Sequence, residues 1–267
     1  MVKIKIGTAG WDYKDWVGPF YPKQLEKARY LPYLSKIFDI VEINSTFYNL
    51  PTESMVINWK NRVPENFRFV VKVWQKITHN LNESDLELNI NNFFSILLLL
   101  NAKIEYFLLQ FPPWFKYTDS HLRKLKSLIK EIPSEYKYII ELRDNSWFNS
   151  EILSNFIDGK RIILGTTYKP DIIPYYLENQ KNYYIRLIGD REITIFNRIQ
   201  RKQKNSLSDL NKNIGKLVKI PSIYEIFIIV NNHFAGFAPE SANELKKKWG
   251  LAYHQFNTQK SLFDFMK

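Results

Sequence analysis

The chain has 267 residues, with 38 Lys and Arg against 27 Asp and Glu, and a formal net charge of +11. Its 45% hydrophobic and 16% aromatic content is enough for a large core and excludes a disordered chain. The lack of cysteine excludes a disulfide scaffold, thiol catalysis, iron–sulfur ligation and a cysteine-ligated zinc site.

No segment of the sequence is typical of a membrane or secretory protein. The longest apolar run, residues 93–100, is far shorter than the ~20 residues that span a bilayer. The first residues alternate charged and apolar side chains and contain no apolar signal-peptide region. We therefore expect a soluble cytoplasmic protein with no membrane contact.

The positive net charge favours an anionic partner. Nucleic acids and small phosphorylated or carboxylated molecules both fit a charge of +11. A genome with biased composition would produce the same excess of Lys, Ile and Asn without any functional reason. The expected partner is an anionic small molecule or a nucleic acid, and the oligomeric state stays open.

In chain order, short apolar runs alternate with longer amphipathic segments, which is typical of βα units. The sequence predicts strands at residues 3–6, 40–43, 67–72, 106–110, 138–142, 162–165, 183–187 and 226–230. It predicts helices at residues 25–35, 54–62, 85–101, 119–132 and 241–249. Eight strands with intervening helices in about 250 residues predict an α/β fold of the TIM-type (β/α) barrel class.

We expect one barrel domain over residues 1–267, with a basic insertion or long loop around residues 190–220. A doubly wound sheet is the structural alternative. Gly7 and Gly10 follow the first predicted strand, but their spacing matches neither a dinucleotide fingerprint nor a P-loop. Both glycines are interpreted as turn residues.

The active site of such a barrel lies at the carboxyl ends of its strands. The alternation of side chains along a strand places Glu42 and Asn44 on one face, and likewise Glu141 and Arg143. Lys72 ends the third strand, where a neighbouring strand could bring it beside Glu42. This pattern predicts either a buried Glu42–Lys72 ion pair or a general acid/base tuned by a cation.

Other strand ends add further polar groups, and together they exceed what core packing requires. We predict Glu42, Glu141 and Lys72 as catalytic residues. The predicted substrate-binding residues are Asn44, Tyr48, His79, Gln110, Arg143, Arg186, Asn231 and His233. The arginines and Lys72 suit a phosphate or carboxylate, and the glutamates suit proton transfer.

The sequence gives no clear sign of a cofactor. The two glutamates could supply oxygen ligands to a divalent metal, so a metal stays open. The four histidines form no His-x-His or Glu-x-x-His cluster, which argues against a multinuclear zinc site.

A basic segment between the seventh and eighth predicted strands is a candidate nucleic-acid-binding arm. Its candidate contacts are Arg198, Arg201, Lys202 and Lys204. The alternative interpretation is a solvated charged face, which is the commoner reason for such a run.

Ordered motifs along nearly the whole chain resemble those of the YecE-like family, the uncharacterised TIM-barrel proteins of "domain of unknown function 72". The resemblance rests on GTAGW at 7–11, VEINSTFY at 41–48, LQFPP at 109–113, ELR at 141–143 and NNH at 231–233. It implies a TIM-type barrel with its site at the strand ends, and it implies no settled reaction.

Two positions depart from the family pattern. The family has Arg-Leu-His-Gly after the seventh strand, where this chain has Ile188 in place of the histidine. The sixth strand commonly ends in an acidic residue, whereas Thr166 and Thr167 stand here. If the family uses those two groups as metal ligands, this chain lacks them.

The leading hypothesis is an enzyme, either a hydrolase or an isomerase, that acts on a phosphorylated or nucleic-acid substrate by Glu general acid/base chemistry. The first alternative is a nucleic-acid-binding protein or nuclease that uses the basic segment at 198–219. The second is a non-catalytic small-molecule binder whose polar barrel mouth holds a ligand without turnover.

Overall fold

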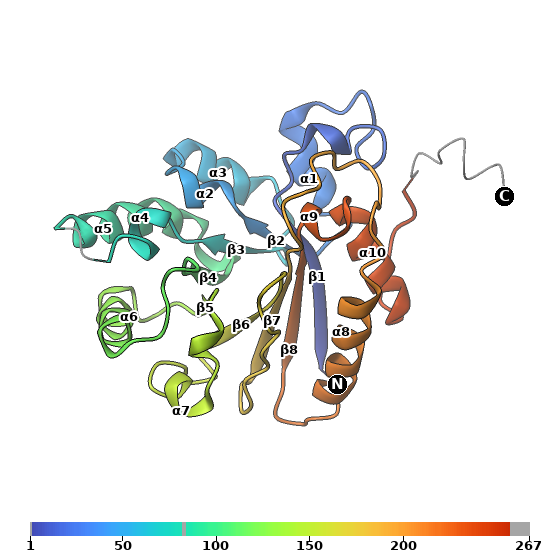
Figure 1. Cartoon of the computed structure of the whole chain (residues 1–267). Coiled ribbons are helices and arrows are strands. Elements are labelled where there is room, and N and C mark those ends of the chain that lie inside the picture. Colours follow the sequence, from blue (N-terminus) through green and yellow to red (C-terminus); the bar gives the residue numbers. More distant parts are fainter. Residues whose placement is uncertain (1, 82–83, 257–267) are drawn as a thin grey trace.

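The computed structural model describes residues 2–81 and 84–256 and shows a closed barrel of parallel strands in sequence order (Figure 1). The first strand pairs with both the second and the eighth, which closes the barrel. The strands are β1 (Lys3–Ala9), β2 (Ile40–Ile43), β3 (Arg68–Lys72), β4 (Ile104–Gln110), β5 (Tyr138–Glu141), β6 (Ile162–Tyr168), β7 (Asn182–Leu187) and β8 (Glu225–Val230). The predicted TIM-type α/β barrel is confirmed.

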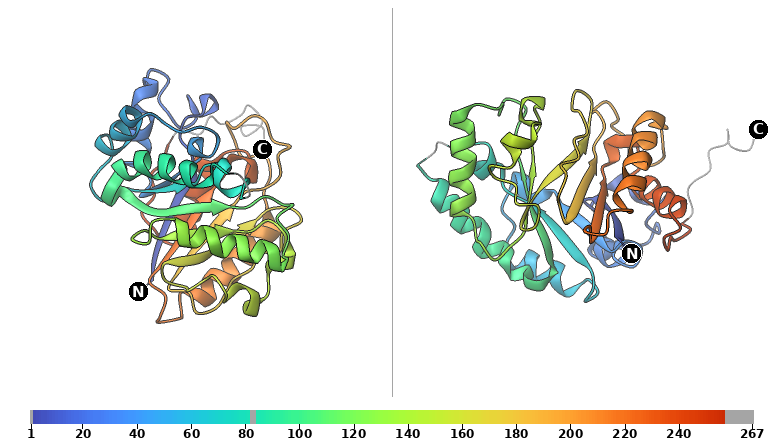
Figure 2. Two further views of the ribbon diagram at one scale, coloured as in Figure 1. Left: turned by 90° about the vertical axis from the view of Figure 1, so that its left-hand side faces the viewer. Right: turned by 90° about the horizontal axis from the view of Figure 1, so that it is seen from below.

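Helices cover the outside of the strands, as Figures 1 and 2 show. The α-helices are α1 (Tyr30–Leu34), α2 (Ser45–Tyr48), α3 (Glu53–Asn61), α4 (Gln75–Thr78), α5 (Leu86–Leu97), α6 (Asp119–Glu131), α7 (Ser150–Leu153), α8 (Lys204–Leu217), α9 (Asn232–Ala235) and α10 (Ala238–Lys248). Short 3₁₀ helices lie at η1 (Lys14–Trp16), η2 (Lys27–Arg29), η3 (Leu98–Lys103) and η4 (Asn145–Trp147). The longer helices bury one apolar stripe, such as Ile90, Phe93 and Leu97 of α5.

The interior of the barrel holds its own cluster of buried side chains, separate from the larger core between strands and helices. This cluster consists of Ala9, Ile40, Val70, Tyr106, Leu108, Ile139, Ile163, Tyr184, Phe227 and Ile229. Because side chains alternate along a strand, the residue two positions further on also faces the interior, nearer the carboxyl end. In β2, β3 and β5 these next residues are Glu42, Lys72 and Glu141. The apolar cluster is therefore the floor under a polar layer.

Gly7 lies inside β1, so the prediction that it is a turn residue was wrong. The strand continues to Ala9, three residues beyond the predicted end. A Cβ atom on Gly7 would lie 1.9 Å from the carbonyl oxygen of Ile40, so glycine permits the close approach of β1 and β2. Gly10 has a φ of 83° and does follow the strand.

The basic segment divides into a loop, residues 188–203, and helix α8. Leu210, Ile214 and Leu217 form the buried side of α8, while Lys212 and Lys216 are exposed. The part of the predicted long loop after residue 203 is thus a regular outer helix of the barrel. Among all described residues, no helix is long and apolar enough to cross a membrane.

Candidate functional site

A cavity of about 850 Å³ opens at the carboxyl ends of the strands. The predicted site residues that line it are Asn44, Tyr48, Lys72, His79, Gln110, Arg143, Arg186, Asn231 and His233. Glu42 and Glu141 are fully buried and contact the lining residue Arg186. The strand-end residues predicted from sequence are therefore brought together at one barrel mouth.

Arg186 of β7 joins the two buried glutamates. Its Nε and Nη2 donate to the two carboxylate oxygens of Glu42 at 2.8 and 2.6 Å. Its Nη1 donates to Glu141. Tyr184, two residues earlier on the same face, donates its hydroxyl to Glu42 at 2.7 Å. Because each buried charge is paired and hydrogen-bonded, the cluster can exist within the barrel without a bound ligand.

Arg143 completes this cluster from the end of β5. Its Nε donates to Glu141 at 2.7 Å, and its side chain is 12% exposed. No described residue accepts a hydrogen bond from its two terminal nitrogens. Two arginines and two glutamates thus carry no net charge together, yet Arg143 keeps donors available at the cavity surface.

The charges of the cluster shift the pKa of Glu141. Burial alone would raise the pKa of this carboxyl, but Arg186, Arg143 and Lys72 together lower it to about 2. Burial alone would likewise lower the pKa of Arg186, but Glu141 and Glu42 raise it above its usual value. Both groups are therefore ionised across the physiological range.

Lys72 forms no ion pair with Glu42, so the predicted Glu42–Lys72 pair was wrong. Both Glu42 oxygens accept instead from Arg186. The Lys72 Nζ lies 3.8 Å from the centroid of the Phe47 ring. Burial lowers the pKa of Lys72 to about 7, with Arg186 and Arg143 acting in the same direction against the two glutamates.

Asn44 follows β2 and is only partly buried, but its Oδ1 has no hydrogen-bond partner among the described residues. Gln110 and Asn231 are already used within the protein. Gln110 Nε2 donates to the carbonyl of Phe111 at 3.0 Å. Asn231 Oδ1 accepts from the backbone N–H of His233 at 3.0 Å and caps α9. Asn44 Oδ1 is thus a buried acceptor without a partner in the described part of the chain, and Gln110 keeps its Oε1 as an acceptor at the cavity.

His79 and His233 both line the cavity. His79 Nδ1 is 2.9 Å from the hydroxyl of Thr78, and burial, followed by Lys72 and Arg143, lowers the pKa of His79 to about 4. His233 Nδ1 lies 3.0 Å from the carbonyl oxygen of Ile193, and burial lowers its pKa as well. Both rings are therefore neutral at pH 7.

The loop after β7 packs directly against the start of α9. Gly189 has a φ of 71°, and a Cβ there would lie 2.2 Å from the carbonyl oxygen of His233. Arg201, further along this loop, forms ion pairs with Asp190 and Glu192. These contacts hold the 188–203 loop beside the cavity.

The predicted nucleic-acid-binding residues do not line this cavity. Arg198, Lys202 and Lys204 are exposed. Arg201 lies in a neighbouring hollow of about 430 Å³, and its charge is compensated by Asp190 and Glu192. The structure therefore does not join the basic segment to the Glu–Arg cluster.

Sequence analysis missed several residues of the site. Tyr184 lies two positions before Arg186, so the alternation along β7 could have identified it. Lys169, Asp171 and Arg191 also line the cavity. They come from loops after β6 and β7, where no periodicity indicates which way a side chain points.

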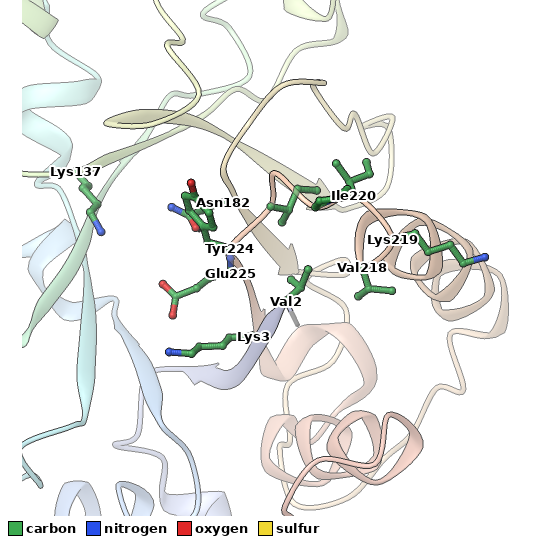
Figure 3. Close-up of a pocket in the computed structure, with 11 residues that line it drawn as sticks. Val2, Lys3, Lys137, Asn182, Val218, Lys219, Ile220, Tyr224 and Glu225 are labelled. Atoms are coloured by element: carbon green, nitrogen blue, oxygen red, sulfur yellow. Dashed lines mark hydrogen bonds between the residues drawn. The ribbon is translucent and has the colours of Figure 1, made fainter.

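A second cavity, of about 660 Å³, lies at the opposite end of the barrel (Figure 3). Asn182 and Glu225, the first residues of β7 and β8, help to line it. Asn182 donates to the hydroxyl of Tyr106 at 3.0 Å, and Glu225 forms a 2.9 Å ion pair with Lys5. These two polar groups are thus used within the protein, and this end of the fold typically serves stability.

Within the described residues, no group of three or more His, Asp or Glu side chains is placed to hold a metal ion. The two buried glutamates, which the sequence suggested as metal ligands, accept hydrogen bonds from arginines. The donor set at the mouth does not fit a divalent cation, because arginine occupies the position between the carboxylates.

The fold and the mouth define a class of protein: a parallel eight-stranded β/α barrel with a buried Glu–Arg cluster under an open cavity. The family model for the "Protein of unknown function DUF72" matches residues 5–263 of the chain. The chain belongs to this family, which confirms the resemblance drawn from its motifs.

Two curated relatives are similar in sequence. The UPF0759 protein YunF of Bacillus subtilis is 26% identical over 279 aligned positions, which cover 94% of this chain and 96% of that protein. The UPF0759 protein YecE of Escherichia coli K12 is 28% identical over 145 positions, covering 54% of this chain and 50% of that protein.

Two solved structures share the fold. A DUF72 family protein of Thermotoga maritima has a TM-score of 0.76 at 23% identity, covering 93% of this chain and 99% of that one. A DUF72 family protein of Enterococcus faecalis has a TM-score of 0.74 at 23% identity, covering 94% and 99%. These similarities show that the barrel fold is shared, and they leave the reaction to be inferred from the site.

Proposed function

We propose that this protein is an enzyme that acts on a small anionic substrate, phosphorylated or carboxylated, in the cavity at the barrel mouth. The observation that carries the proposal is that two cationic side chains, Arg143 and Lys72, line the same cavity. Arg143 is held through its Nε by Glu141 and keeps its terminal nitrogens for a ligand. Lys72 adds a buried cation that pairs with no carboxylate of residues 2–81 and 84–256.

The charge balance of the site supports an anionic ligand. Glu42 and Glu141 offset the charges of Arg186 and Arg143, so protonated Lys72 leaves the cluster with one positive charge. An arginine can hold a carboxylate or phosphate through two parallel N–H donors. One anionic group bound at Arg143 would therefore neutralise the remaining positive charge of the cluster.

The proposal assigns proton transfer to Lys72. The sequence suggested Glu42 or Glu141 as general acid/base. A carboxylate whose pKa is about 2, as for Glu141, stays ionised and is a poor proton donor at neutral pH. A group with a pKa of about 7, as for Lys72, can both accept and donate a proton there. In this assignment the glutamates fix the positions of the arginines.

The alternative of a nucleic-acid-binding protein or nuclease is less well supported. It depends on the basic segment, where Arg201 is paired and the exposed residues lie outside the cavity. The non-catalytic binder has the same anion site as the proposed enzyme and differs from it only in turnover.

Calorimetric titration with inorganic phosphate at low ionic strength tests the proposal. We expect saturable binding by the native protein and a loss of about tenfold or more in Arg143→Gln, because a charge-assisted hydrogen bond contributes roughly 1.5–3 kcal/mol. Lys76→Gln removes a nearby exposed lysine and serves as the control. Equal affinity in the native protein and Arg143→Gln would overturn the assignment of the anion site. Binding without turnover of any phosphorylated or carboxylated compound would favour the binder.

A further inference from the structure

Lys72 differs from the other buried lysines of the described chain, which are Lys103 and Lys246. Lys103 Nζ donates to the carbonyl of Pro64 at 2.7 Å and to Glu65 at 3.1 Å. Lys246 Nζ donates to the carbonyl of Ile37 at 2.8 Å. Lys72 Nζ has neither a carbonyl nor a carboxylate as acceptor in the described residues. Of these three lysines, Lys72 is the one whose amine faces the cavity and keeps its donors free for a molecule bound there.

The surroundings of Lys72 suit a reactive amine. The residue is 7% exposed, yet it lines the open cavity, so a small molecule can reach the nitrogen. The Phe47 ring, 3.8 Å away, packs against the amine and offers no proton acceptor. Two arginine charges nearby favour the neutral amine, which has the lone pair needed for attack on a carbon atom.

We propose that Lys72 forms an imine with the carbonyl carbon of a substrate whose carboxylate or phosphate binds Arg143. This inference rests on the proposed function, because the same anion site positions the substrate. The substrate class is thereby narrowed from any small anion to a small aldehyde or ketone that carries an anionic group.

The neutral amine is the form that attacks. The lone pair of Nζ forms a C–N bond to the carbonyl carbon, and the C=O π pair moves to oxygen. A proton passes from the attached nitrogen to this oxygen through solvent water, which gives a neutral carbinolamine. A second proton, taken from solvent, allows the hydroxyl group to leave as water, while the nitrogen lone pair forms the C=N bond of a protonated imine. Addition of water reverses the sequence and releases the carbonyl compound and the free lysine.

Trapping with sodium borohydride tests the proposal, since hydride addition to the imine carbon gives a stable secondary amine. The probes are glyoxylate, which carries a carboxylate, and glycolaldehyde phosphate, with neutral glycolaldehyde as the comparison. After trapping at pH 7, intact-mass measurement counts the adducts and peptide mapping locates them. The two anionic probes distinguish a carboxylate from a phosphate substrate.

With at least one anionic probe, we expect one adduct per chain, located at Lys72. The probe concentration needed should be roughly tenfold lower than for glycolaldehyde. At pH 7 about half of Lys72 would be neutral, against roughly one in 2,500 for a lysine of ordinary pKa. Lys72→Arg should lose the adduct, and Lys76→Arg, which removes an exposed lysine facing the Trp74 ring, should keep it.

Labelling of Lys72 that is no faster than labelling of exposed lysines, with both anionic probes, would overturn the imine proposal. Because labelling is mapped in the native protein, this result does not depend on whether a variant folds. Phosphate binding that depends on Arg143 would then still support the anion site, so failure of the imine proposal is distinguishable from failure of the proposed function.

Discussion

The Lys72 ammonium faces the ring of Phe47 at 3.8 Å, in place of the carboxylate of Glu42 that its strand position suggested. The aromatic face attracts a cation without offering it a proton acceptor. Glu42 and Glu141 are occupied by Arg186. The mouth therefore combines a neutralised ionic cluster with one lysine whose charge depends on pH.

Replacing Phe47 by Leu should lower the pKa of Lys72 further, because the ring stabilises the protonated form. A cation–π contact is worth about 0.5–2 kcal/mol, which corresponds to a decrease of roughly 0.4–1.5 pH units. NMR titration of the ¹³C-methylated lysine measures this midpoint. Trp74→Leu removes the ring that faces Lys76 and should leave the Lys72 midpoint in place. An unchanged midpoint in Phe47→Leu would contradict the role given to the ring.

Replacing Lys72 by Met should stabilise the protein at acidic and neutral pH. The folded-state pKa of about 7 lies below the unfolded value of about 10.4. Between these values the unfolded chain binds more protons, so native stability rises with pH through this window by up to ~4.6 kcal/mol. Lys72→Met should lack that rise. Urea unfolding at pH 6 and pH 9 measures this rise in the free energy of unfolding, with Lys76→Met as the matched control. The prediction would be refuted if the free energy of unfolding changed with pH equally in the native protein and in Lys72→Met.

The barrel was predictable because each strand is a short apolar run that differs from the amphipathic helices between them. The one-turn helices α2, α4, α7 and α9 were not predicted, since four residues show no helical period. Helix α8 had a usable signal in the spacing of Leu210, Ile214 and Leu217. The basic residues around it led instead to the prediction of a loop.

That the side chains of the site meet at one barrel mouth was also predictable, but the ion pairs among them were not. Alternation along a strand gives the face of a side chain, which placed Glu42, Lys72 and Arg186 at the barrel mouth. The alternation does not indicate which side chain on another strand each of these residues contacts across the barrel interior. Strand β7 is not a neighbour of β2, yet Arg186 reaches Glu42 from there, because its long side chain crosses the barrel.

Replacing Glu141 by Gln should destabilise the protein and change its response to acid. The variant leaves Arg186 and Arg143 with one carboxylate fewer, and breaking a buried pair in this way costs about 3–5 kcal/mol. The pKa of Glu141 is about 2 when folded and about 4.3 when unfolded. Its stabilisation is therefore complete above pH 4.3 and disappears as the pH falls towards 2.

Urea unfolding at several pH values between 6 and 2 checks this prediction. The stability difference between the native protein and Glu141→Gln should shrink as the pH falls below about 4.3. Glu151→Gln, at an exposed position of α7, is the control for losing one carboxylate. A difference that stays constant down to pH 2 would mean that Glu141 does not gain its stabilisation from ionisation.

Substituting Ser for Arg198, Lys202 and Lys204 should leave phosphate affinity at the mouth within about twofold, because these exposed residues do not line the cavity and distant surface charges are screened by salt. The same calorimetric titration measures it. The triple variant Arg123→Ser, Lys126→Ser, Lys130→Ser removes equal charge from exposed positions of α6, outside the basic segment, and is the control. Titration with duplex DNA at several salt concentrations tests the nucleic-acid alternative. The slope of log affinity against log salt concentration becomes shallower by about 0.9 for each phosphate contact that is lost. A shallower slope in the first variant only would favour that alternative.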